Sequence, residues 1–240
     1  MSQKILITGA SGGIGSAIAR TFAINNYEVL LQYNKNSESA LYLEKLFKDN
    51  NCKCSIFKAD LLSTEDIKNL ANKVSDIDVL INNAGISENM IFTDMSDEQI
   101  LNTLNLNLTA AMLLTKYLLP KMIKKKRGKI INISSVWGIT GASCEVAYSS
   151  AKAGLIGFTK ALAKEVGPSG ICVNCVAPGA IKTNMLSEYS KETLENLANS
   201  TPLMRLGEPS DIASLVYFLA SEKADFITGQ IISPNGGLVI

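Results

Sequence analysis

The chain has 240 residues, of which 47% are hydrophobic and 19% charged, and its net charge is +1. This balance gives no general reason to expect nucleic acid or a membrane surface as a partner. No apolar run reaches the roughly 18 residues that span a bilayer, and the chain opens directly into a predicted strand, which leaves no room for a signal peptide. We therefore expect one cytoplasmic domain, 1–240, with a large core.

Short β-prone runs alternate with segments of helical periodicity along the chain. The predicted strands are 4–8, 27–33, 53–58, 77–81, 129–133, 171–176 and 230–233. The predicted helices are 16–24, 37–49, 63–74, 97 to about 125, 146–166 and 209–220, with a further helix within 185–206. Pro120 is the only interruption of the long helix, and Ser63 with Asp66 comes close to a capping box. The alternation predicts a single-domain, Rossmann-type, doubly wound parallel sheet of about seven strands with helices on both faces.

A glycine-rich turn, Gly9-Ala-Ser-Gly-Gly-Ile-Gly15, connects the first predicted strand to the first helix. This geometry aims backbone N–H groups and a helix N-terminus at a pyrophosphate. Glycine is needed because a Cβ would hold the phosphate away. The spacing is not the common Gly-x-Gly-x-x-Gly, so a tight turn that binds no ligand stays an alternative.

Tyr148 and Lys152 lie four residues apart, and Ser135 precedes the tyrosine by thirteen residues. On a helix, positions i and i+4 share a face, so the ammonium of Lys152 should lie near the phenol. A nearby positive charge favours phenolate, so we expect the pKa of Tyr148 to fall below its ordinary value of about 10. The tyrosine can then transfer a proton near neutral pH, in a chain that has no histidine.

The five cysteines are an odd number without the spacing of a disulfide framework. Cys172 and Cys175 have redox or zinc spacing, but they lie in a predicted strand, where residues three apart point to opposite faces. Cys52 and Cys54 flank one lysine near another strand. We expect no metal site, because the chain has no histidine and neither pair has further ligands nearby.

These motifs, in this order, resemble the short-chain dehydrogenase/reductase family over nearly the whole chain, and most closely the bacterial 3-oxoacyl-[acyl-carrier-protein] reductases. The residues that carry the resemblance are 8–15, Asp60, 82–85, Asn107, Ser135, Tyr148, Lys152, Pro178-Gly179 and 202–209. The resemblance implies that hydride passes from a nicotinamide to the ketone carbon of a 3-oxoacyl thioester.

The resemblance also implies a catalytic set of four residues. Tyr148 would protonate the carbonyl oxygen, and Ser135 would hydrogen-bond that oxygen. Lys152 would lower the pKa of the tyrosine and bind the nicotinamide ribose. Asn107 would hold the water that returns a proton through the lysine. Ser134 and Asn105 are neighbouring alternatives, and the intervals along the chain favour Ser135 and Asn107.

The implied cofactor site extends from the glycine-rich turn to the loop after the sixth strand. Its residues are Gly9, Ser11, Gly13, Ile14, Gly15, Asn34, Lys35, Asp60, Leu61, Asn83, Ala84, Gly85, Tyr148, Lys152, Pro178, Gly179, Ile181 and Thr183. Asp60 would bind the adenine amine, or else cap the following turn. Thr183 would meet the nicotinamide carboxamide.

The second predicted strand ends without the Asp or Glu that NAD enzymes use to hold the ribose 2′-hydroxyl. Lys35 can supply a positive charge for a 2′-phosphate, with Asn34 and Ser11 as donors. We therefore expect NADP(H) rather than NAD(H). Against this, many NADP-using relatives have a basic residue where this chain has Gly12, and Lys35 can equally be a solvated surface lysine.

Residues 185–206 lie where the family places a variable substrate lid, which could cover an acyl chain, a steroid or a small ketone. Its expected apolar contacts are Met185, Leu186, Tyr189, Leu194 and Leu197. The basic cluster 124–127 either docks an acidic acyl carrier protein or simply ends a helix with solvated cations. Ser169 and Gly170 stand where carrier-protein reductases often have arginine. Whether Trp137 and Glu145 shape the pocket or face another subunit stays open.

Two other functions are also compatible with this sequence. One is a short-chain alcohol or hydroxysteroid dehydrogenase that acts on a small ketone or secondary alcohol. The other is a non-catalytic dinucleotide-binding regulator, although all four catalytic residues are present. The family further implies a homotetramer that packs through the long helix, helix 146–166 and the C-terminal segment, where Asn235 replaces a usual aspartate.

Overall fold

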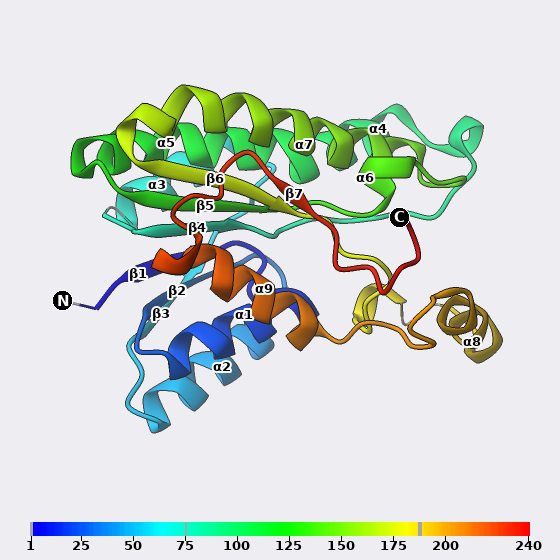
Figure 1. Ribbon diagram of the computed structural model, residues 1–240, viewed down its shortest axis with the longest axis horizontal. Helices are drawn as coiled ribbons and strands as arrows, with labels where there is room; N and C mark the ends of the chain where they lie inside the picture. The colour runs from blue at the N-terminus through cyan, green and yellow to red at the C-terminus, as the bar shows by residue number, and fades with distance from the viewer. Residues whose placement is uncertain (1, 75, 187–188) are drawn as a thin grey trace.

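The computed structural model describes residues 2–74, 76–186 and 189–240, with the backbone alone at Met185. Its strands form one parallel sheet in the order β3-β2-β1-β4-β5-β6-β7 (Figure 1). They are β1 (Lys4–Ile7), β2 (Glu28–Tyr33), β3 (Cys54–Lys58), β4 (Val79–Asn82), β5 (Gly128–Ile133), β6 (Ile171–Val176) and β7 (Ile231–Ile232). The predicted α/β sheet is confirmed, with β7 shorter than expected.

Helices cover both faces of the sheet, because both faces of its strands are apolar. Ile5 and Ile7 of β1 pack toward α1 (Gly13–Ile24), α2 (Ser37–Asp49) and α9 (Pro209–Ala220). Leu6 packs toward the opposite layer. That layer comprises α3 (Thr64–Lys73), α4 (Asp97–Leu104), α5 (Ala110–Lys125) and α7 (Val146–Val166), drawn above the sheet in Figure 1.

The predicted helix 97–125 is continuous but not uniform. α4 and α5 are joined by a π-helical turn, Asn105–Thr109, and Pro120 lies inside α5 without ending it. Single π turns inside helices are frequent at functional sites. This turn contains Asn107, so the irregularity falls on a predicted catalytic residue.

Two local expectations need correction. Ser63 caps α3 by accepting from the N–H of Asp66, but the carboxylate of Asp66 accepts from the N–H of Asp60 instead of completing a capping box. Helix α6 (Trp137–Thr140) was not predicted. It follows β5 directly, and such a short segment carries too little periodicity to detect.

All five cysteines are free, and in β6 Cys175 is buried while Cys172 is partly exposed. Among the described residues, no group of three or more His, Cys, Asp or Glu side chains could hold a metal ion. Within the described part of the chain, no helix is both long and apolar enough to cross a membrane.

The carboxyl ends of parallel strands meet at one edge of a sheet, where ligands of such folds bind. The glycine-rich turn follows β1, residues 83–85 follow β4, Ser135 follows β5, and Pro178 follows β6. The fold therefore gathers at one edge motifs that are far apart in sequence.

Candidate active site

The glycine-rich turn packs tightly around its own backbone. Gly9 adopts a positive φ of 62°, and the N–H of Gly12 donates to the carbonyl of Gly9 at 3.1 Å. A Cβ on Gly15 would lie 2.4 Å from that carbonyl oxygen, so the turn has no room for a side chain there. α1 begins without a side-chain cap, so its first N–H groups face the turn, and this fits a pyrophosphate.

Two residues to which sequence reasoning gave no role, Gln32 and Thr8, hold the loops at this edge in place. Gln32, buried at the end of β2, accepts from the N–H of Gly9 and donates to the carbonyl of Ala59, each at 2.8 Å. The hydroxyl of Thr8 accepts from the N–H groups of Asn83 and Ala84. A polar residue at the carboxyl end of a buried strand was the available signal in both cases.

The side chain of Asn83 is turned toward the glycine-rich turn. Its amide donates to the carbonyls of Thr8 and Gly9 at 2.9 and 3.2 Å. In this structure Asn83 therefore links the loop after β4 to the loop after β1. Lining of a cofactor by Asn83 and Ala84 stays a prediction.

The structure brings Ser135, Tyr148 and Lys152 together in a buried cluster. The hydroxyl of Ser135 acts on the phenol of Tyr148 and lowers its pKa. The ammonium of Lys152 lies 5.5 Å from the centroid of the tyrosine ring and donates to the carbonyl of Ile133 at 2.9 Å. The hydroxyl of Ser134 instead donates to the carbonyl of Lys152 at 2.9 Å and so anchors α7.

The pKa of Tyr148 does not follow the expectation. Burial raises it to about 12; the hydrogen bond from Ser135 lowers it and the charge of Glu145 raises it further. Burial also lowers the pKa of Lys152 to about 8. The expected lowering of the tyrosine pKa by Lys152 is therefore wrong for this structure, because desolvation by burial is the largest effect on this pKa and raises it. A tyrosine that stays protonated at neutral pH suits the role of proton donor.

Because its ammonium is buried, Lys152 should lower the stability of the fold near neutral pH. Below pH 8 Lys152 is protonated both folded and unfolded, so the full cost of burying its charge is present. Between pH 8 and 10.5 only the unfolded state keeps the proton, so the cost fades as pH rises. Lys152→Met should therefore be more stable than wild type near neutral pH, by on the order of 2–3 kcal/mol, and this advantage should shrink toward alkaline pH.

Urea unfolding of both proteins across this pH range checks the Lys152 prediction. Taking the difference between the two cancels the contributions of titrating groups that do not interact with Lys152. A difference that stays constant with pH would contradict it.

The side-chain amide of Asn107 makes hydrogen bonds through its nitrogen but not, among the described residues, through its oxygen. Its amide donates to the carbonyls of Ile86 and Thr103 at 2.8 and 2.9 Å, while its buried Oδ1 has no hydrogen-bond partner among the described residues. A Cβ on Gly85 would lie 2.4 Å from this oxygen and 3.3 Å from the ammonium of Lys152. Both groups thus converge on Gly85, an arrangement that suits a bridging water. Asn105, the alternative, is exposed.

The adenosine end of the predicted cofactor site lies between two loops. The hydroxyl of Ser39, in the first turn of α2, donates to the carbonyl of Ser11 at 3.3 Å, which brings the start of α2, and with it the short loop after β2, toward the glycine-rich turn. Lys35 is exposed in that loop. Asp60 caps the next turn by accepting from the N–H of Leu62, so the alternative role is seen here, and adenine binding stays a prediction. The adjoining Leu61 is buried.

The segment after β6 reaches the glycine-rich turn. A Cβ on Gly13 would lie 2.6 Å from Cγ2 of Thr183, and the N–H of Val136 donates to the carbonyl of Pro178 at 2.8 Å. A cavity of about 240 Å³ is lined by Thr183 and by lid residues such as Leu186 and Leu194. Thr183 is thus placed between the lid and the predicted cofactor site.

The predicted lid contains helix α8 (Lys191–Ser200). The amide of Asn89, in the loop after β4, donates to the phenol oxygen of Tyr189 at 3.1 Å. Ser187, Glu188 and the side chain of Met185, which belong to the predicted lid, lie outside the described residues.

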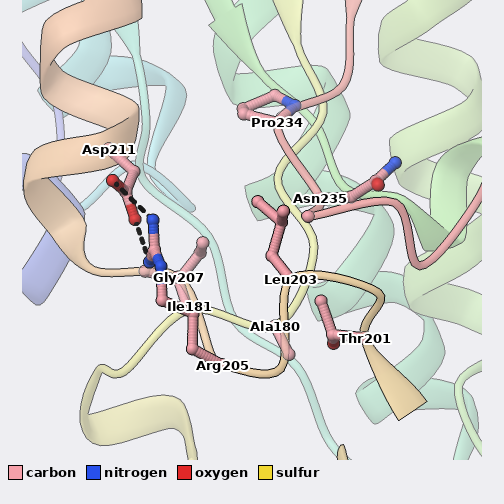
Figure 2. Close-up of a pocket in the computed structure, with 10 residues that line it drawn as sticks. Ala180, Ile181, Thr201, Leu203, Arg205, Gly207, Asp211, Pro234 and Asn235 are labelled. Carbon is pink, nitrogen blue, oxygen red and sulfur yellow. Dashed lines mark hydrogen bonds and ion pairs between the residues drawn. The ribbon is translucent and has the colours of Figure 1, made fainter. Parts of the chain in front are cut away.

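A second cavity, of about 210 Å³, lies between the segment after β6, the end of the lid and the C-terminal loop. Figure 2 shows Ile181, Leu203 and Asn235 on its walls. It also shows the guanidinium of Arg205, which donates to the two carboxylate oxygens of Asp211 at 2.7 and 3.2 Å. None of the four predicted catalytic residues lines this cavity, so it is separate from the buried cluster.

The basic cluster 124–127 lies at the other edge of the sheet. α5 ends at Lys125, and β5 begins at Gly128, so the cluster sits at the amino ends of the strands. Lys125 pairs with Asp76 and Asp78 at 2.8 and 3.1 Å, and Arg127 pairs with Glu222 at 2.9 Å. Within this chain the cluster does not border the Tyr148 site.

Comparison with known proteins agrees with this geometry. A family model described as enoyl-(acyl carrier protein) reductase matches residues 9–239. An uncharacterized oxidoreductase, YmfI, of Bacillus subtilis is 45% identical over 99% of both chains. A 3-oxoacyl-[acyl-carrier-protein] reductase of Aquifex aeolicus is 42% identical over 97% of this chain and 96% of its own. Nodulation protein G of a Rhizobium species is 39% identical over 99% of this chain and 97% of its own.

Proposed function

The chain belongs to the short-chain dehydrogenase/reductase family, and from this premise we propose that it reduces the ketone of a 3-oxoacyl thioester with NADPH. The observation that carries the proposal is the buried cluster of Ser135, Tyr148 and Lys152, with the oxygen of Asn107, unpaired among the described residues, close to Gly85 beside it. Relatives named 3-oxoacyl-[acyl-carrier-protein] reductases support the thioester as substrate.

The residues after β1 and β4 fit a dinucleotide. The turn leaves no room for a Cβ at Gly15 or at Gly9, and the first N–H groups of α1 face it. When bound, NADPH supplies the hydride that reduces the carbonyl carbon. Ser11, Asn34 and Lys35 would hold its 2′-phosphate, and Thr183 its carboxamide.

Ser135 and Tyr148 act on the ketone oxygen of the substrate. Ser135 donates a hydrogen bond to that oxygen and holds it beside the phenol of Tyr148. Tyr148, which is protonated at neutral pH, gives its proton to the oxygen as negative charge develops there. Lys152 and Asn107 hold a water between them, through which the phenol recovers its proton from solvent.

The test of this function is the rate of NADPH and NADH oxidation with acetoacetyl thioesters of coenzyme A and of acyl carrier protein. We expect both thioesters to be reduced, faster with NADPH. Turnover of small secondary alcohols or steroid ketones without turnover of either thioester would move the protein to the alcohol dehydrogenase class. Faster turnover of the carrier-protein thioester would support a carrier-protein partner.

The preference for NADPH should depend on Lys35. We expect Lys35→Asp to lower kcat/KM for NADPH about ten- to a hundredfold, because a carboxylate beside a 2′-phosphate replaces attraction by repulsion. The value for NADH should change little. Lys45→Asp, at an exposed position of α2, is the matched control and should leave both cofactors unaffected. Equal losses for both cofactors would contradict the assignment.

We also propose that the protein is a homotetramer. Large apolar side chains are exposed on the predicted interfaces: Leu101 and Met112 on the long helix, and Phe226 and Ile240 near the C-terminus. Exposed apolar groups of this kind often mark interfaces. Light scattering should give the mass of four chains, and Met112→Lys should give a smaller species. A monomeric wild type would exclude this assembly.

A further inference from the structure

Glu145 is an acidic residue beside the catalytic tyrosine with no role in the mechanism above. It stands at the N-cap of α7, three residues before Tyr148, and its carbonyl accepts from the N–H of Ser149 at 2.8 Å. Its carboxylate accepts from the hydroxyl of Ser87 at 2.9 Å. Ser87 follows Gly85 by two residues, so this bond joins the loop after β4 to the start of the catalytic helix.

The carboxylate of Glu145 is half-buried and has no cation beside it. Burial raises its pKa and the hydrogen bond from Ser87 lowers it, and no described cation contributes. An unpaired carboxylate withdrawn from water costs stability, and such groups concentrate at functional sites. The negative charge of Glu145 also acts on the phenol of Tyr148, whose pKa it raises.

The loop that faces Glu145 brings a second carboxylate to this part of the site. Loop 86–90 is tied to the loop before α7 by the N–H of Met90, which donates to the carbonyl of Cys144 at 2.9 Å. That loop brings a second carboxylate, Glu88, held by the amide of Gln99 at 2.6 Å. The lid adds the phenol of Tyr189, which accepts from the amide of Asn89. On α7 the ammonium of Lys152 is directed at the carbonyl of Ile133.

We propose that Glu145 is a specificity-determining residue that excludes ketones with a negative charge close to the reacting carbonyl. The proposal rests on the reduction of a ketone at Tyr148. A free 3-oxo acid carries a carboxylate two carbons from its ketone carbon, so binding at Tyr148 would bring two like charges close together. A thioester or ester masks that charge. Glu145 would thus confine the site to 3-oxo acids that have already been esterified or thioesterified.

The kinetic test compares acetoacetate with its neutral ethyl ester in wild type and Glu145→Gln. Glutamine keeps the shape and can still accept from Ser87, but it removes the charge. We expect kcat/KM for acetoacetate to rise about tenfold, the scale of a screened like-charge contact, and the value for the ester to change less than about twofold. Glu88→Gln, which changes a carboxylate already bound by Gln99, should have a smaller effect on acetoacetate. Equal changes for acid and ester in Glu145→Gln would overturn the proposal.

A pH series separates charge from structure. Protonation of Glu145 should give wild type the same gain for acetoacetate, relative to the ester, as pH falls, and Glu145→Gln should lack this gain. Glu88, Cys144 and Lys152 are common to both proteins, and the effect of Glu145 on the pKa of Tyr148 acts on acid and ester alike, so it cancels in their ratio. Identical pH dependence of the acid-to-ester ratio in the two proteins would overturn the proposal.

A binding measurement keeps the inference independent of turnover. Trp137 is the only tryptophan of the chain, and its backbone N–H donates to the hydroxyl of Ser135 at 3.2 Å, so its fluorescence reports on the site. With NADP⁺ present, acetoacetate should bind about tenfold tighter to Glu145→Gln than to wild type, and the ester equally to both. If neither ketone is reduced, the proposed reaction fails, while the binding difference still decides the role of Glu145. Equal acetoacetate affinities would refute that role.

Discussion

Replacing Tyr148 by phenylalanine should lower kcat for thioester reduction by about 10²- to 10⁴-fold, the usual contribution of a positioned proton donor. The buried phenol lies beside Ser135, and burial raises its pKa to about 12, so it carries a proton at every pH near neutrality. Phenylalanine keeps the ring in the same packing but has no proton to give. Steady-state rates measured at saturating NADPH and thioester check this result.

Two controls show whether the loss in Tyr148→Phe is chemical. NADPH should bind the variant with nearly wild-type affinity in a calorimetric titration. Tyr42→Phe, at an exposed position of α2, should retain full activity. A Tyr148→Phe enzyme with more than about a tenth of the wild-type kcat would exclude the phenol as the principal proton donor.

Replacing Gly15 by alanine should abolish dinucleotide binding, with Kd raised at least about a hundredfold, and should destabilise the fold by about 1–3 kcal/mol. A Cβ there would lie 2.4 Å from the carbonyl oxygen of Gly9 and 2.9 Å from Cα of Ala10, which are both backbone atoms. The turn cannot simply move aside, because Gln32 and Asn83 hold Gly9 by hydrogen bonds. Calorimetric titration with NADPH and urea unfolding measure the two effects.

Gly157→Ala is the matched control for this substitution. Gly157 is exposed on α7, and a Cβ there would meet no atom within 4 Å. Alanine should stabilise the helix by about 0.5–1 kcal/mol and leave NADPH binding unchanged. If Gly15→Ala bound NADPH as tightly as Gly157→Ala does, the glycine-rich turn would not be the phosphate site.

The placement of the catalytic candidates was accessible from sequence because it depends on short-range periodicity. A helix brings residues four apart to one face, so Tyr148 and Lys152 were expected together, and the strand before Ser135 delivers it to the same edge of the sheet. The intervals along the chain favoured Asn107 over Asn105, and the structure buries the first and leaves the second exposed, but the π turn that contains both was not predicted. Residue spacing alone does not reveal where a helix widens.

The pKa values were beyond the reach of sequence. The pairing of Tyr148 with Lys152 predicted a lowered tyrosine pKa, because their separation along a helix was known and their burial was not. In the structure both side chains are buried and the ammonium is directed at the carbonyl of Ile133, so desolvation determines both pKa values. Burial depends on every segment that packs around a site.

The sequence by itself determined the alternation of strands and helices and the glycine-rich turn, because each follows from local periodicity or from a motif of fixed spacing, and its resemblance to a known family supplied the proposed catalytic set. Only the tertiary structure showed that Gln32 supports the turn, that Lys125 and Arg127 are paired away from the catalytic edge, and that Glu145 meets Ser87. These contacts join residues 23 to 95 positions apart along the chain. Which distant side chains meet is decided when the layers pack against the sheet, and no local pattern carries that information.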